Sequence, residues 1–192
     1  MFCEGGIYCL KKSNTYNLVM SSIMATFVTI STFLGVVIPI GDMNTTFHLG
    51  NITCLLAGII LGPIYGSLSA AVGSVIFDIL NPIYITSIPF TFVFKFIMTF
   101  ICGTIAYNNG KNGENQFYNI IGATVGSVVY IVLRAIKSLI INLYLLKMEP
   151  LTAILLTLNG TFFSVLKTIF TVGAVAILLP IIREKLSERN LQ

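Results

Sequence analysis

Apolar runs of about twenty residues or more follow one another along the chain, and they restrict what it can fold into. The first covers about residues 16–38 without a charged side chain, and it is apolar on every face rather than alternately apolar and polar. A bilayer core about 30 Å thick needs roughly 20 apolar residues per helix. Because a membrane strand alternates between lipid-facing and lumen-facing residues, these runs predict helices rather than a β-barrel.

The breaks between these runs predict six transmembrane helices in a single membrane-embedded domain that covers residues 1–192. Proline lacks an amide donor and glycine frees the backbone, so both interrupt an apolar helix. The predicted helices cover about residues 16–38, 50–62, 66–80, 90–107, 117–146 and 151–182. With 56% hydrophobic and only 9% charged residues, the fold class is an all-α integral membrane bundle.

Basic residues are distributed unevenly between the two ends of this bundle. The end that carries the termini receives Lys11, Lys12, Lys111, Arg183, Lys185 and Arg189, and the opposite end receives Lys147. By the positive-inside rule, both termini are cytoplasmic in a multi-pass protein of a bacterial-type cell membrane. Membrane orientation therefore explains the net charge of +4, and nucleic acid is not an expected partner.

The sequence lacks the motifs of a metal site, a nucleotide site or a nucleophilic enzyme. Its four cysteines, at positions 3, 9, 54 and 102, lie singly and without metal-ligand spacing. There is no His-Glu-x-x-His motif and no Gly-rich Lys-Ser/Thr loop. We therefore expect neither a metal nor a cofactor nor catalysis, and any energy for transport must come from another protein.

Five charged residues lie inside the apolar runs: Asp78, Lys95, Arg134, Lys137 and Lys167. Each costs about 2.5–3.5 kcal/mol on insertion scales, so each needs a reason. Four cations against one carboxylate leave positive charge that a carboxylate or phosphate ligand could neutralise. Aromatic residues at positions 84, 130 and 163 could stack on a ring. The predicted substrate-binding residues are His48, Asn51, Asp78, Tyr84, Lys95, Arg134, Lys137 and Asn159.

These residues also have structural interpretations. Lysines near helix ends often reach lipid phosphates, and an Asp78–Lys95 pair can simply tie two helices together. Lys167 lies roughly 24 Å along its helix from Leu151, so it either lines the site or faces a partner. His48 lies in the outer loop, where a lone histidine is more often solvated than functional.

The region between residues 48 and 78 carries a longer pattern. His48-Leu49-Gly50-Asn51 is followed by Ala57-Gly58, by Gly62-Pro63-Ile64-Tyr65-Gly66, and by Gly73-Ser74 four residues before Asp78. This pattern resembles the S components of energy-coupling factor (ECF) vitamin transporters, especially the riboflavin-type branch. The chain length, the six helices and the cytoplasmic termini extend the resemblance over nearly the whole sequence.

The resemblance implies a substrate-binding subunit that takes a B vitamin or a related micronutrient from outside the cell. A transmembrane coupling protein and two cytoplasmic ATPases then supply the energy, and the S component topples in the membrane to release its cargo. The coupling protein docks on a small-residue motif in the first helix, which matches Ser21 and Ala25, although Ser22 and Thr26 fit the same spacing. The cations favour pantothenate, folate or a phosphorylated vitamin, and riboflavin is also compatible.

Two other classes of function are weighed against this interpretation. A small intramembrane enzyme could use Asp78 or His48 on a lipid, but the sequence offers no paired acid and base at convincing spacing. A self-sufficient channel or secondary transporter is disfavoured by the missing internal repeat and the single buried carboxylate. Ligand binding without partners, lipid turnover and conductance distinguish the three.

Overall fold

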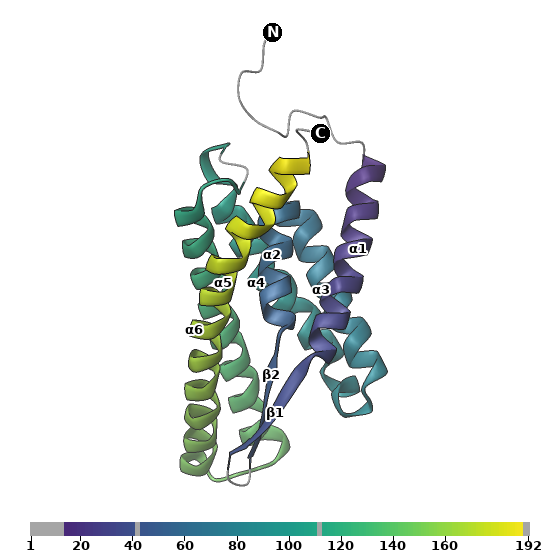
Figure 1. Cartoon of the computed structure of the whole chain (residues 1–192). Helices are drawn as coiled ribbons and strands as arrows, with labels where there is room; N and C mark the ends of the chain where they lie inside the picture. The colour runs from purple at the N-terminus through teal and green to yellow at the C-terminus, as the bar shows by residue number, and fades with distance from the viewer. Residues whose placement is uncertain (1–13, 41–42, 111–112, 190–192) are drawn as a thin grey trace.

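The computed structural model describes residues 14–40, 43–110 and 113–189, so Lys11, Lys12 and Lys111 lie outside the described residues. This part of the chain forms six α-helices and one β-hairpin: α1 (Asn14–Phe33), β1 (Gly35–Ile40), β2 (Met43–His48), α2 (Gly50–Leu61), α3 (Pro63–Leu80), α4 (Ile88–Ala106), α5 (Gln116–Ile140) and α6 (Pro150–Arg189). Short 3-10 segments cover Pro82–Ser87 (η1) and Asn108–Gly110 (η2), and a π-helical segment, Ile141–Leu145, follows α5. The helices run alternately, so α1 begins and α6 ends at the same end of the bundle (Figure 1).

Five helical segments are long and apolar enough to cross a membrane: Thr15–Phe33, Pro63–Leu80, Tyr84–Ala106, Gln116–Leu145 and Pro150–Ile182. The chain is therefore a multi-pass membrane protein. Helix α2 is different, because its 12 residues cover only about 18 Å and cannot cross a 30 Å hydrocarbon core alone. Helix α6 is the opposite case, since its 40 residues extend about 60 Å.

A β-hairpin replaces the end of the predicted first helix, which corrects that helix boundary and adds one hairpin to an otherwise helical bundle. Helix α1 ends at Phe33 instead of residue 38, and β1 pairs antiparallel with β2 from Gly35–His48 to Ile40–Met43. Three β-branched residues, Val36 to Ile38, precede Pro39, and such a run favours extended backbone over helix. The strand pairing gives these backbone groups hydrogen-bond partners, which a chain at membrane depth requires.

The turn between α2 and α3 shows why its glycines and proline are needed. Gly62 adopts a φ of +84°, which a residue without a Cβ tolerates. Pro63 then occupies the first position of α3, where its missing amide is harmless, so the helix begins three residues earlier than predicted. A Cβ on Gly66 would lie 2.4 Å from the Ala57 carbonyl oxygen, so glycine allows α3 to pack directly against α2.

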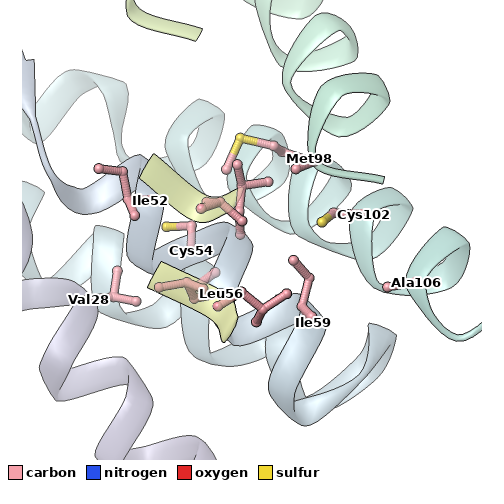
Figure 2. Packing of buried hydrophobic residues seen from close by; sticks show 13 residues of the cluster. Val28, Ile52, Cys54, Leu56, Ile59, Met98, Cys102 and Ala106 are labelled. Atoms are coloured by element: carbon pink, nitrogen blue, oxygen red, sulfur yellow. The ribbon is translucent and has the colours of Figure 1, made fainter. Parts of the chain in front are cut away.

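Helix α2 forms the centre of the bundle, because it packs against α1, α3, α4 and α6. Its residues from Ile52 to Ile59 are all buried. Figure 2 shows the surrounding apolar side chains, among them Val28 from α1 and Met98 and Cys102 from α4. The short helix is thus held by the longer helices around it.

Candidate functional site

A group of polar side chains gathers in the half of the bundle that lies away from the termini. We define the polar cluster as Asn51, Asp78, Lys95, Tyr130, Arg134 and Lys137. Asn51 lies in the first turn of α2, Asp78 in the last turn of α3, and Lys95 in the first half of α4, while the other three lie on α5. A hydrogen bond, a cation–π contact and electrostatic interactions connect these side chains.

Lys95 connects three helices. Its side chain is only 9% exposed, and its ammonium group donates a hydrogen bond to the Asn51 side-chain oxygen on α2. The same Nζ lies 4.8 Å from the centroid of the Tyr130 ring on α5. A cation over an aromatic face is attracted by the ring quadrupole. The amide and the ring together hold this buried charge in place.

Asp78 is the single acidic residue of the spans, and it is buried. Its carboxylate interacts with the Thr91 side chain and, electrostatically, with Lys95 and Lys137. One carboxylate oxygen, Oδ2, has no hydrogen-bond partner among the residues that the structure describes. A buried acceptor left unpaired costs about 1–3 kcal/mol or more, so this oxygen is suited to receive a hydrogen bond from a ligand.

Lys137 and Arg134 lie one turn apart on α5 and extend the positive charge away from Asp78. The Lys137 ammonium group donates to the Ser87 hydroxyl at 3.0 Å and lies 4.5 Å from the centroid of the Phe90 ring. Arg134 is exposed and interacts electrostatically with Lys137 and with Lys167 on α6. The sequence left open whether Lys167 lines the site or faces a partner, and its interaction with Arg134 is the one link described between this lysine and the polar cluster.

Three predicted residues are not members of the polar cluster. Tyr84, in η1, packs against Phe77 with ring centroids 6.0 Å apart. Asn159 is exposed on α6, because its eight-residue separation from Lys167 turns the helix about 80° beyond two full turns. His48 ends β2, and its side chain lies outside the part of the structure that is described.

Sequence reasoning missed two polar residues at this site. Ser87 binds Lys137, and Thr91 contacts Asp78. Together with Lys95 they are spaced four residues apart, hence they follow one face of α4 and its leading turn. This polar stripe in an otherwise apolar segment is visible in the sequence, and it could have identified both residues.

Ser21 and Ala25, which the resemblance assigns to docking, are largely buried within the bundle. Ser21 is 9% and Ala25 7% exposed. A Cβ on Gly73 of α3 would lie 2.4 Å from the Ala25 carbonyl oxygen, so α1 and α3 are in close contact there. Ser22 and Thr26 are exposed on the other side of α1.

Among the described residues, no group of three or more His, Cys, Asp or Glu side chains is arranged to hold a metal ion. The site instead offers hydrogen-bond donors, one free carboxylate oxygen and aromatic rings, arranged around several cations. Such a set can bind a polar ring or an anion, and it has no nucleophile paired with a base.

Comparison with known proteins identifies the family. No curated protein sequence matches the chain. Among solved structures, the crystal structure at 2.1 Å of the S component for biotin from an ECF-type ABC transporter has the same fold, with a TM-score of 0.58 and 23% sequence identity over 88% of this chain and 95% of that one. The sequence matches the family described as "ECF-type riboflavin transporter, S component" over residues 12–184. This chain therefore belongs to the family of ECF-type riboflavin transporter S components, and it is the substrate-binding subunit of an ECF transporter rather than an enzyme.

Proposed function

We propose that the polar cluster is the site at which this subunit binds its vitamin. One observation carries the proposal: Asn51, Asp78 and Lys95 come from three helices and converge with Tyr130 of a fourth, in a bundle whose other buried side chains are mainly apolar. Each buried charge is costly in a membrane. A ligand that donates to Asp78 and accepts from Lys95 would offset that cost, which explains why these side chains are present.

The composition of the site suggests the kind of vitamin. Tyr130 and Phe90 present rings already faced by lysine side chains. Stacking surfaces beside hydrogen-bonding groups suit a flat polar ring. The family description names riboflavin, and the similar solved structure is an S component for biotin. We therefore infer that the substrate is a ring-containing B vitamin, and riboflavin is the first compound to test.

The orientation of the subunit follows from its basic residues. The predicted topology assigns six of them to the end with the termini and only Lys147 to the other end, which supports cytoplasmic termini by the positive-inside rule. The polar cluster then faces the outside of the cell, where a vitamin must be captured. A membrane-impermeant maleimide added to intact cells should leave the two amino-terminal cysteines, Cys3 and Cys9, unmodified.

Energy for uptake comes, in this proposal, from a transmembrane coupling protein and two cytoplasmic ATPases. Helix α1 is the docking element we infer, through its exposed face with Ser22 and Thr26, since the neighbouring small residues are buried against α3. Small residues permit close helix approach in a membrane. Uptake into cells should therefore require the coupling protein and the ATPases, whereas vitamin binding should not.

The test of the binding proposal is titration of a B-vitamin panel into the purified subunit, with native mass spectrometry to identify any retained compound. We expect one compound to bind at one-to-one stoichiometry. Lys95→Met should weaken its binding by at least tenfold, about 1.4 kcal/mol. Thr104→Val is the matched control, because Thr104 is exposed near the other end of α4 and bonds only within its own helix. If no vitamin binds, the proposal fails, and if Lys95→Met binds normally, the site lies elsewhere.

A further inference from the structure

Helix α6 contains a proline inside its membrane-spanning part. Pro180 lies within the helix, two residues before the span ends at Ile182. Proline has no amide hydrogen, so it cannot donate the helical hydrogen bond to the carbonyl four residues earlier, and its ring crowds that carbonyl. In α6 this carbonyl belongs to Ala176. The backbone hydrogen-bond pattern of α6 is therefore interrupted close to the end of the span.

Gln116, the first residue of α5, supplies the missing donor. Its side-chain amide nitrogen, Nε2, donates a hydrogen bond to the Ala176 carbonyl oxygen at 3.2 Å. Bilayer hydrocarbon offers no water to an unpaired carbonyl, and neighbouring helices often satisfy the backbone groups that a proline frees in a span. The Gln116 side chain thus takes the role that a backbone amide at position 180 would have, and it joins the start of α5 to the last part of the α6 span.

Helix α6 is held differently on the two sides of Pro180. Leu179 is 2% exposed and belongs to the hydrophobic core cluster of the bundle. Ile181 is 50% exposed, and Ile182 is only partly buried. We define the terminal arm as residues 183–189, five of which are charged, so this segment extends from the span into water. The weakened position of the helix therefore lies between a part fixed in the core and a part that leaves the bilayer.

We propose that Pro180 is a hinge between the α6 span and the terminal arm, and that Gln116 is a latch that holds the arm in one direction. Kinks in helices occur mostly at proline, because the missing hydrogen bond lets the two parts of the helix turn relative to each other. While Gln116 is bonded to Ala176, the start of α5 fixes the hinge. When this bond opens, the arm turns about Pro180. The device is independent of the substrate, since none of its residues belongs to the polar cluster.

A double-mutant cycle tests the link between latch and hinge. Gln116→Leu removes the donor and should lower the melting temperature by roughly 2–12 °C. Pro180→Ala returns a backbone amide to the Ala176 carbonyl, so Gln116→Leu should have little effect in this background. Thr124→Val is the matched control, because Thr124 is exposed on α5 and donates to Ile120 of the same helix. Equal effects of Gln116→Leu in both backgrounds overturn the latch.

Distances between two spin labels show whether the latch directs the arm. One label replaces Thr104, which is exposed near the end of α4, and the other replaces Ser187 of the arm. The two amino-terminal cysteines are changed to serine, and the other two are buried and stay unlabelled. Ser187 lies about 10 Å beyond Pro180, so a turn of about 20° moves it by about 4 Å.

We expect one narrow distance in the wild-type background, a shifted or broadened distance in Gln116→Leu, and a narrow one again when Pro180→Ala is added. The same distance with and without Gln116→Leu makes this residue a helix cap only, even if the melting temperature falls, and overturns the hinge. A broad distance that persists after Pro180→Ala overturns it as well, because the motion then lies elsewhere in the chain.

Discussion

Gly126 allows α5 to approach α4 directly beside the polar cluster, so Gly126→Ala should weaken both folding and binding. A Cβ at this position would lie 2.5 Å from the Met98 carbonyl oxygen, a backbone atom that cannot move alone. Ordinary contact begins at 3.4 Å, so the two helices must separate by 3.4 − 2.5 = 0.9 Å. Met98 lies one turn from Lys95, and Gly126 lies one turn from Tyr130.

The size of the effect follows from this separation. Overpacking typically costs about 1–3 kcal/mol, which lowers the melting temperature by roughly 2–12 °C at about 2–4 °C per kcal/mol. The same movement lengthens the 4.8 Å distance from the Lys95 Nζ to the Tyr130 ring centroid toward the 6 Å limit of a cation–π contact. We therefore expect vitamin affinity to fall by about tenfold. Circular dichroism follows unfolding, since the chain has no tryptophan.

Two other glycines serve as controls. Nothing lies within 4 Å of a Cβ built on Gly160, so Gly160→Ala should leave the melting temperature unchanged or slightly higher. A Cβ on Gly122 would lie 2.7 Å from the Cys102 carbonyl oxygen of α4, but Gly122 is one turn farther from the cluster. Gly122→Ala should therefore destabilise the protein with a smaller effect on binding. If Gly126→Ala has the same melting temperature as Gly160→Ala, the close approach of α4 and α5 is refuted.

Three more predictions address the site, the core and the docking face. Asp78→Asn should weaken vitamin binding by about tenfold in the same titration, because it removes the charge from the acceptor that lacks a partner, and an unchanged affinity would exclude Asp78 from the site. Cys54 and Cys102 are 0% exposed, so a membrane-permeant maleimide should modify neither of them before unfolding, as read by intact mass in a variant whose other two cysteines are serines. Leucine at Ser22 and Thr26 should prevent co-purification with the coupling protein without altering vitamin affinity, and an intact complex would place docking on another surface.

The hairpin shows why an apolar run does not by itself give a helix boundary. Residues 34–40 are as apolar as the helix before them, so hydropathy cannot separate the two. The distinguishing signals were chemical: Val36, Val37 and Ile38 are β-branched, Pro39 disfavours helix, and Gly41-Asp42 is a turn-forming pair. The partner strand, with Thr45 and Thr46, contributes further β-branched residues. Strand pairing depends on contacts between the two segments, which a helical pattern cannot reveal.

The polar cluster was easier to predict than the contacts within it. A charged side chain inside a span has a high free energy of membrane insertion, so it usually faces the interior of the bundle. Asp78, Lys95 and Lys137 could therefore be identified from the sequence as candidate site residues. Their partners could not, because Asn51 meets Lys95 only through the tertiary packing of α2 and α4. The role of Lys167 also stayed open, because the neighbours of this side chain depend on how α6 packs against α5, and its electrostatic interaction with Arg134 comes from that packing.

The unequal helix lengths explain why the site lies where it does. Helix α2 is only about 18 Å long. Its first turn, which carries Asn51, therefore lies within the length that the longer helices span. Helices α5 and α6 continue past the start of α2 (Figure 1), and α5 contributes Tyr130 and Arg134 to the cluster. A longer α2 would fill this level with apolar side chains and leave the cations without a role. The short central helix, rather than any single charged residue, is therefore what places a polar site within an apolar bundle.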